Sequence, residues 1–413
     1  MSDPVADDTL RDGPLTGIRV LELGSTVAGP FCGRLLADFG AEVIKVEPAE
    51  GDTVRTMGKR LDGRSLYAAS IFRNKSLISV DLRLPEGQEV VRKLVRSCDV
   101  VVENFRPGAL ERWNIGYTEL SRINPALIMV RISGFGQTGP YSGRPGFGVI
   151  GEALSGLRHV TGDPDRPPAR VAVSLTDYIT GLYGAFGAVM AILAQRQTGR
   201  GQYVDTALYE AAFSFMEPHI AAYEKLGFVA GRAGSRLPDN VPNNLYATRD
   251  QGFVHIAAVG DPVFRRLLLT MQRNDLLEDA RFRTGIDRAA HADELDAIIA
   301  EWTEAHDLAS LEKLLHESDV PASRIFTMAD IFRDPHFAAR RAIVDAPDQE
   351  LGSIKMANVV PRLSATPGRV RRAGGGVVGL DTRDVLARLA GLSAAEIDGL
   401  ATAGVIACPS EVQ

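Results

Sequence analysis

Cysteine is scarce in this chain, which has only three in 413 residues. Cys32, Cys98 and Cys408 are far apart and form no Cys-x-x-Cys pair, and no histidine lies at a spacing typical of a zinc site. The sequence therefore predicts neither a disulfide framework nor a bound metal. Buried, reduced thiols in a cytoplasmic protein are the simplest interpretation of this pattern.

Long apolar runs and a large excess of one charge are also missing. No stretch reaches the roughly 20 apolar residues of a membrane-spanning helix, because the nearest one, residues 178–193, is interrupted by glycines. Residues 1–8 are acidic and contain no apolar core, so we expect no signal or transit peptide. A net charge of -6 gives no general attraction to nucleic acid or to an anionic membrane, and we expect neither as a partner.

The common nucleotide-binding and hydrolase motifs are absent too. A turn bounded by Gly24 and Gly29 follows a predicted strand, and Glu47 comes about 20 residues later, as in NAD-binding folds. The glycines do not have the GxGxxG spacing, and no Walker A, GxSxG or HExxH motif occurs. An NAD-dependent oxidoreductase stays an alternative, which a search for nicotinamide absorbance changes would test.

Predicted strands and helices alternate through the first half of the chain. This alternation favours a doubly wound α/β domain with a parallel sheet and right-handed crossovers. After residue 226 the composition changes to a loop rich in Gly and Pro and then to short polar helices, which predicts a smaller α+β domain over residues 226–340. We expect strands over residues 17–23, 41–47, 76–82, 99–103, 127–132, 203–206, 253–258 and 354–362, and helices over 31–39, 86–97, 109–113, 117–123, 149–157, 178–193, 207–225, 382–389 and 394–402.

One carboxylate lies at a chemically interesting junction. Residues 171–173 form a short β-branched run, and an apolar helix rich in small residues follows, with Asp177 between them. The first N–H groups of a helix have no helical partner, and the helix dipole favours negative charge there. Ser, Thr or Asp at such a place is most often a helix cap. These residues alone leave a catalytic role for Asp177 open.

Eight segments, in order along nearly the whole chain, carry a resemblance to a known family. They are PLTGIRVLEL (14–23), AGP (28–30), LADFGAEVIKVEP (36–48), RNK (73–75), VENFRPG (102–108), ISGFG (132–136), TGRGQ (198–202) and ADIFRDPH (329–336). In these segments the chain resembles the class III CoA-transferases, which include formyl-CoA transferase, carnitine CoA-transferase and α-methylacyl-CoA racemase.

The resemblance implies a mechanism for Asp177. The matching aspartate of the family attacks an acyl-CoA thioester, forms a mixed anhydride and then an aspartyl-CoA thioester, and an acceptor carboxylate finally takes the CoA. This is covalent catalysis by a carboxylate that stays ionised at neutral pH. It implies an acyl-CoA such as succinyl-CoA and a carboxylic acid as substrates. It implies no permanently bound cofactor.

The resemblance also suggests which residues contact CoA. The turn after the first strand matches the segment that grips CoA through its backbone, and basic residues further on are candidates for the phosphates. A turn-rich loop after the strand 127–132 lies where parallel sheets bind ligands. The predicted CoA contacts are Ser25, Thr26, Val27, Ala28, Arg73, Lys75, Asn104, Phe105, Arg106, Arg112, Gly134 and Phe135.

The chain departs from parts of the family pattern. Racemase members have a histidine base where this chain has Phe147, and His159 lies twelve positions further on, so we favour transfer over racemisation. An acyl-CoA racemase or isomerase and a non-catalytic CoA-binding subunit of a heteromeric transferase are the alternatives. The segment 236–243 replaces a glycine-rich flap, which predicts a different acyl pocket. Arginines in 55–73 and the pair Asn243-Asn244 are candidates for recognising a second carboxylate.

The resemblance implies an interlocked homodimer, with a heteromer as the alternative. It also implies that the two ends of the chain share one domain. We therefore expect a large CoA-binding α/β domain from residues 1–225, the small domain over 226–340, and a return segment, 341–413, that completes the large domain.

Overall fold

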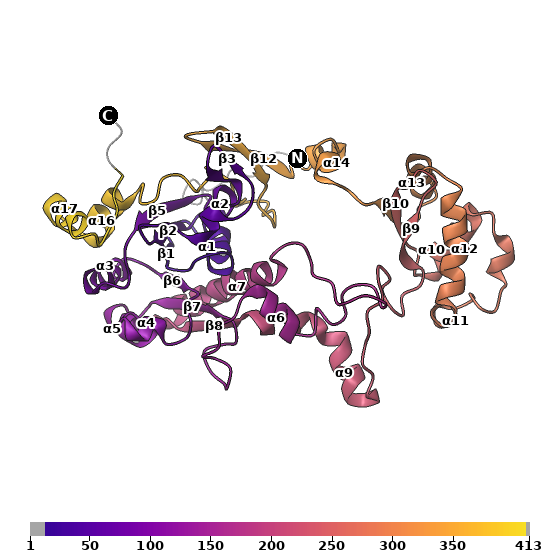
Figure 1. Ribbon diagram of the computed structural model, residues 1–413, viewed down its shortest axis with the longest axis horizontal. Helices are drawn as coiled ribbons and strands as arrows, with labels where there is room; N and C mark the ends of the chain where they lie inside the picture. The colour runs from indigo at the N-terminus through magenta and orange to yellow at the C-terminus, as the bar shows by residue number, and fades with distance from the viewer. Residues whose placement is uncertain (1–12, 410–413) are drawn as a thin grey trace. The chain divides into compact units, whose positions relative to one another are not determined.

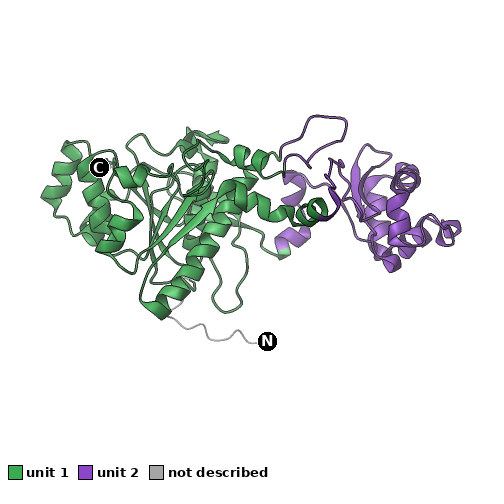
Figure 2. Ribbon diagram, turned by 90° about the horizontal axis from the view of Figure 1, so that it is seen from below, with its two compact units in different colours: residues 1–157, 171–224, 339–413 green, residues 158–170, 225–338 purple. Residues whose placement is uncertain are grey.

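The computed structural model describes residues 13–409, so the acidic leader lies outside the described residues. The chain packs into two compact units, one formed by residues up to 157, 171–224 and 339 onward, the other by residues 158–170 and 225–338 (Figure 2). The segment 158–170, which the sequence assigned to the large domain, belongs to the second unit. Its backbone is tied there, because Gly234 N–H donates to the Gly162 carbonyl at 3.0 Å.

The first unit is built on a six-stranded sheet in the order β5-β2-β1-β6-β7-β8, and every neighbouring pair is parallel (Figure 1). In the centre, Leu21 is in register with Ile44 on one side and Val101 on the other. The predicted parallel α/β sheet is therefore confirmed. Its strands are β1 (Arg19–Glu22), β2 (Glu42–Glu47), β5 (Lys75–Ser79), β6 (Val100–Glu103), β7 (Ile128–Ser133) and β8 (Tyr203–Ala207).

Helices cover both faces of this sheet. On one face α1 (Ala28–Asp38) and α7 (Leu175–Thr198) pack on buried strand residues such as Val20 and Val130. On the other face α3 (Pro85–Val95), α5 (Tyr117–Ile123), α16 (Thr382–Ala390) and α17 (Ala394–Thr402) bury a second apolar cluster. The remaining helices of this part of the chain are α2 (Leu66–Ile71), α4 (Ala109–Arg112), α6 (Gly148–Leu154), α8 (Leu208–Phe213) and α9 (Glu217–Leu226), with 3-10 turns η2 (Thr53–Thr56) and η3 (Ser214–Met216).

The chain returns to the first unit after residue 339. An antiparallel hairpin of β12 (Ile343–Asp348) and β13 (Gly352–Ala357) precedes the two closing helices. A second, two-residue hairpin, β3 (Arg60–Leu61) with β4 (Arg64–Ser65), lies earlier in the chain, and neither it nor β12 was predicted. Arg64 joins the two hairpins through an ion pair with Asp348 at 2.6 Å.

The second unit has an antiparallel sheet in the order β11-β10-β9 and several short helices. Its core is apolar, with Val254, Leu267 and Leu295 fully buried. Strand β9 of this sheet was not among the predicted strands. The elements are β9 (Asn243–Ala247), β10 (Phe253–Ala257), α10 (Asp261–Thr270), η4 (Asn274–Leu277), α11 (Gly285–Ala290), α12 (Ala292–Glu304), α13 (Leu308–Glu317) and β11 (Ala322–Arg324), followed by α14 (Met328–Ile331) and α15 (Pro335–Ala339).

Helix α7 is long and apolar enough to cross a membrane by length and composition alone, and no other helix in residues 13–409 meets that test. It lies against α1, β7 and β8. Small residues make the approach possible: a Cβ atom on Gly181 would lie 2.7 Å from the Ala28 carbonyl oxygen of α1. The opposite side of α7 is apolar and exposed, with Leu182, Tyr183, Phe186, Met190 and Leu193 on it.

Candidate active site

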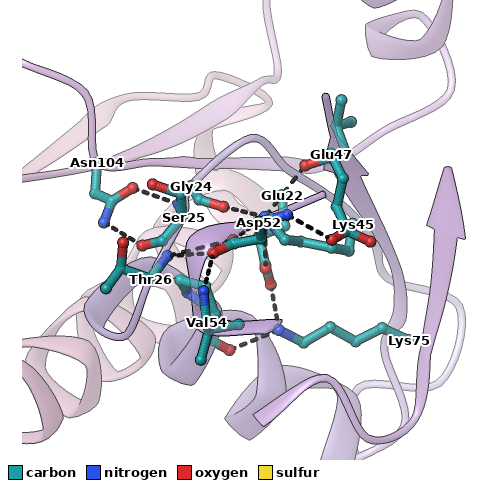
Figure 3. Close-up of polar contacts among 12 residues, drawn as sticks. Glu22, Gly24, Ser25, Thr26, Lys45, Glu47, Asp52, Val54, Lys75 and Asn104 are labelled. Carbon is teal, nitrogen blue, oxygen red and sulfur yellow. Dashed lines mark hydrogen bonds and ion pairs between the residues drawn. The ribbon is translucent and has the colours of Figure 1, made fainter. Parts of the chain in front are cut away.

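The turn after β1 is tied to the loop after β6. Ser25 N–H donates to Asn104 Oδ1 at 2.7 Å, and Asn104 Nδ2 donates back to the Ser25 carbonyl at 2.8 Å (Figure 3). Strands β1 and β6 are neighbours where the order of the sheet reverses. Because parallel sheets bind ligands outside the carboxyl ends of their strands at such a reversal, this pair of loops is a candidate binding site.

A buried charge network lies beneath the same turn. Thr26 has the left-handed φ of 68°, which is uncommon for a residue other than glycine. Its N–H donates to the Asp52 carboxylate at 2.9 Å, and Lys45, which is buried, contacts that carboxylate at 3.0 Å and donates to the Gly24 carbonyl (Figure 3). Burial acts to raise the pKa of Asp52, but Lys45 and two backbone N–H groups outweigh it and lower the pKa. The network fixes the direction of the turn's amide and carbonyl groups.

Two of the predicted phosphate ligands lie in the core instead. The Arg73 guanidinium is fully buried and donates to Asp38 at 2.6 and 2.9 Å. Lys75 is also buried, and its ammonium group donates to Glu22 at 2.7 Å and to the Pro30 carbonyl at 2.6 Å. A phosphate cannot reach either cation in this arrangement, so we give both residues a structural role in place of the predicted CoA contact.

A cavity of about 290 Å³ opens at the carboxyl ends of β1, β2 and β5. The ring centres of Phe105 and Trp113, which both line it, are 5.3 Å apart in an edge-to-face arrangement. Arg83, an exposed side chain that pairs with Asp81 at 2.7 Å, also lines it. Sequence reasoning missed Arg83 and Trp113. The signal that could have identified Arg83 is its position four residues past β5, at the same edge of the sheet as Ser25.

The loop after β6 is held by a buried carboxylate. Phe105 N–H donates to Glu103 at 2.8 Å, and Arg131 Nε donates to the other oxygen of Glu103 at 2.8 Å. Burial raises the pKa of Glu103 to about 7, although Arg131 lowers it. Arg106 and Arg112, the two predicted basic contacts on this side, are exposed.

Asp177 lies in the first turn of α7, three residues after Ser174 at the N-cap position. The β-branched run 171–173 forms no strand in the structure. Helix α7 starts at Leu175, so Asp177 lies in the first turn of a helix, where the dipole favours negative charge.

The Asp177 carboxyl group lies directly against Gly148. A Cβ atom built on Gly148 would lie 2.0 Å from Asp177 Oδ2, and the three atoms nearest to it all belong to this carboxyl group. Gly148 is buried at the start of α6, and Gly134 and Phe135 begin the loop that leads to it. That loop closes on itself, because a Cβ atom on Gly134 would lie 2.9 Å from the Cα atom of Gly146.

Aromatic contacts connect the Asp177 turn to α1 and α2. Tyr178, the next residue, meets the Phe31 ring edge-on with centres 4.7 Å apart, and its hydroxyl donates to the Tyr67 hydroxyl at 2.9 Å. Val27, from the turn after β1, is part of the same apolar cluster. The predicted CoA turn and the predicted nucleophile are therefore joined by one packed layer of side chains.

Most of the candidates for a second carboxylate site are already engaged. Arg55 pairs with Glu47 at 2.6 Å, and Asn244 Nδ2 donates to Asp296 at 2.8 Å. Asn243 lies 2.8 Å from the His255 ring nitrogen. Within residues 13–409 no group of three or more His, Cys, Asp or Glu side chains is placed to hold a metal ion.

Comparison with known proteins identifies the class of enzyme. Residues 15–382 match CoA-transferase family III. This chain belongs to that family. The succinyl-CoA–D-citramalate CoA-transferase of Chloroflexus aurantiacus is 48% identical to it over 382 residues, covering 92% of this chain and 95% of the relative. The succinate–glutarate CoA-transferase of Agrobacterium fabrum is 36% identical, covering 88% and 92%.

Some relatives of this family III CoA-transferase are subunits, and others have been solved as crystal structures. The beta subunit of the succinyl-CoA–L-malate CoA-transferase of Chloroflexus aurantiacus is 39% identical, covering 97% of this chain and 100% of the subunit. A CAIB/BAIF family protein from Brucella suis is 33% identical with a TM-score of 0.81, covering 92% and 100%. A hypothetical protein from Mycobacterium tuberculosis is 26% identical with a TM-score of 0.79, covering 92% and 98%. The chain is thus an enzyme that uses CoA thioesters.

Proposed function

We propose that this family III CoA-transferase moves CoA from succinyl-CoA to a free carboxylic acid, with Asp177 as the nucleophile. The observation that carries the proposal is the position of the Asp177 carboxyl group at the start of α7 and against Gly148. The names of three relatives contain succinyl-CoA or succinate, which supports succinyl-CoA as the donor. A hydroxylated or plain dicarboxylic acid such as citramalate, malate or glutarate is the proposed class of acceptor.

The proposed reaction needs only carboxylate and thiolate chemistry. An Asp177 oxygen attacks the thioester carbon, the C–S bond breaks, and CoA thiolate leaves a mixed anhydride behind. The thiolate then attacks the Asp177 carbonyl carbon, which releases the donor acid as a carboxylate and forms an aspartyl-CoA thioester. The acceptor carboxylate repeats these two steps in reverse. No proton is gained or lost overall, and Asp177 ends as the free carboxylate.

The protein's contribution is to keep the carboxylate ionised, to orient it and to exclude water. The helix start favours the charged form of Asp177. Backbone N–H groups beside Gly148 are the proposed donors to each oxyanion, because only a residue without a side chain lets the carboxyl group approach so closely. The packed layer of Tyr178, Phe31 and Tyr67 limits the entry of water, which would hydrolyse an anhydride.

We propose that CoA lies along the loops at the carboxyl edge of the sheet. The fixed backbone of Ser25 and Thr26 would bind the thioester arm, and the cavity lined by Phe105 and Trp113 would take the adenine ring. Arg83, Arg106 and Arg112 are exposed and are the proposed phosphate contacts.

We propose that a second copy covers the exposed apolar face of α7. Phe186 on this face is 58% exposed, and such a contiguous apolar surface is typical of a protein–protein interface. The test is the mass of the purified protein in sedimentation. A dimer is expected for the wild type, and Phe186→Asp, which would bury a charge in the interface, is expected to shift the protein toward monomer.

The alternatives predict different behaviour. Phe147, at the racemase base position, has no proton-accepting group, so we expect no exchange of the α-proton of an acyl-CoA with solvent. If the chain were a non-catalytic subunit of a heteromeric transferase, Asp177→Ala would leave the transferase activity unchanged.

The deciding experiment follows transfer of CoA from succinyl-CoA to citramalate, malate and glutarate with the wild type, Asp177→Ala and Asp163→Ala. Asp163 is a matched control, since it is an exposed carboxylate of the second unit. We expect Asp177→Ala alone to abolish transfer. Full activity of Asp177→Ala would overturn the proposal.

A further inference from the structure

Arg34 is a largely buried cation near the nucleophile that the mechanism has not used. It lies on α1, and only 15% of its side chain is exposed. Its guanidinium carbon is 4.8 Å from the centre of the Phe31 ring, and that ring contacts Tyr178, the residue after Asp177. Two side-chain contacts therefore lead from Arg34 to the first turn of α7.

The charge of Arg34 is incompletely neutralised. Asp38, four residues further along α1, already accepts hydrogen bonds from Arg73 and from Asn74 at 2.8 Å. Arg34 Nε is 3.5 Å from Asp38 Oδ2, and this buried nitrogen has no hydrogen-bond partner among the described residues. Two guanidinium groups thus share one carboxylate, which leaves an excess positive charge in a part of the protein where charges are poorly solvated.

The pKa shifts of the neighbouring groups agree with an excess of positive charge at Arg34. Burial and the charge of Arg73 lower the pKa of Arg34, against a smaller opposite effect of Asp38. Burial, Tyr178 and the negative charge of Asp177 raise the pKa of Tyr67, while Arg34 lowers it. The same phenol therefore senses both Asp177 and Arg34. An arginine stays protonated at neutral pH even when its pKa is lowered.

The balance of these charges changes during the proposed reaction. In the resting enzyme the negative charge of Asp177 and the positive charge of Arg34 act in opposite directions on the same phenol, that of Tyr67. Formation of the aspartyl-CoA thioester removes the negative charge, because a thioester is neutral. The positive charge of Arg34 remains at the stage when the acid acceptor must bind.

We propose that Arg34 binds a carboxylate group of the acid acceptor while Asp177 carries CoA as a thioester. This proposal rests on the proposed function. The planar guanidinium can donate two parallel hydrogen bonds to a carboxylate, which makes it selective for acids over neutral acceptors such as alcohols or water. Arg34 would thereby attract the acid acceptor and also determine which class of acceptor takes the CoA.

The test compares Arg34→Gln with the wild type at saturating succinyl-CoA, using whichever of citramalate, malate and glutarate the wild type uses best. We expect the KM for the acid to rise about tenfold or more, as the loss of charge-assisted hydrogen bonds predicts. The dissociation constant for free CoA, measured by calorimetry, should stay within twofold. A structural defect would raise both the KM for the acid and the dissociation constant for CoA. An acid KM within twofold of the wild type, or an equal loss of CoA affinity, would overturn the inference.

Two further variants keep the test decisive. Arg371→Gln is the matched control, because Arg371 also donates to α1, through the Ala37 carbonyl at 2.8 Å, and it should leave the acid KM unchanged. If Arg34→Gln does not fold, Arg34→Lys replaces it. Lysine keeps the charge but cannot bind bidentately, so a several-fold higher acid KM with unchanged CoA affinity is expected, and an unchanged acid KM would contradict the inference. If the wild type forms no CoA thioester at all, the proposed function fails instead.

Discussion

Replacing Gly148 by alanine should disable the nucleophile while leaving the fold intact. The added Cβ atom would lie 2.0 Å from Asp177 Oδ2, whereas close C···O contacts lie at about 3.3–3.6 Å. The carboxyl group must therefore move by about 1 Å or more. The backbone of Gly148 is not in the left-handed region, so alanine adds no backbone strain there. A misplacement of about 1 Å can cost about 100-fold in rate.

The assay is a single turnover with succinyl-CoA, quenched at short times, in which the CoA bound to the enzyme is measured. We expect Gly148→Ala to form this intermediate about 100-fold more slowly, with an unchanged melting temperature. Gly143→Ala is the matched control, because a Cβ atom at Gly143, in the same loop, would have no neighbour within 4 Å. A rate for Gly148→Ala within threefold of the wild type would refute the placement of Asp177 against this glycine.

Three more predictions concern charged groups in the first unit. Asp52→Asn should raise the KM for succinyl-CoA several-fold at constant kcat, since the turn loses the carboxylate that holds its amides; a fall in kcat alone would contradict this. Arg73→Gln should lower the free energy of unfolding in urea by about 3–5 kcal/mol, because it leaves Asp38 buried without its main partner. A variant that is as stable as the wild type but binds CoA weakly would show instead that Arg73 contacts a CoA phosphate. Hydrogen bonds with Arg64 lower the pKa of Asp348 to about 2, so the stabilising effect of this carboxylate is present above pH 3.8 and is lost as the pH falls toward 2. Asp348→Asn should therefore lose less stability than the wild type over this pH range. Parallel curves of unfolding free energy against pH for the two proteins would contradict this prediction.

The parallel sheet could be predicted because its signals are local. Short β-branched runs ended by Gly or Pro alternate with amphipathic helices, and α5 and α17 have the predicted bounds. Elements without such signals were missed. Strand β12 contains Pro347, a residue that argues against a strand, and it forms because it is paired on one side in a two-stranded hairpin. The run 171–173 has the composition of a strand but forms none, so composition alone does not decide the structure there.

The candidate site was predictable where one residue decides its own surroundings. The place of Asp177 at a helix start could be predicted from its neighbours, whereas its proposed catalytic role comes from the family resemblance. The contacts of the basic residues could not be predicted, because a sequence cannot tell whether a cation meets a phosphate or a carboxylate distant in the chain. Lys75 pairs with Glu22, 53 positions away, and Arg73 with Asp38, 35 positions away. Arg83 went unnoticed because its position four residues past β5 was a signal only once the cavity that it lines was known.

The central claim is a covalent intermediate on Asp177, and one measurement tests it most directly. The tryptic peptide of residues 171–196 contains Asp177 and no other Asp or Glu, so any carboxyl adduct on it is assigned without ambiguity. After incubation with succinyl-CoA and rapid acid quench, mass spectrometry should find this peptide heavier by CoA minus water, as a thioester requires. Turnover with this peptide unmodified, or with the adduct on another peptide, would contradict the account.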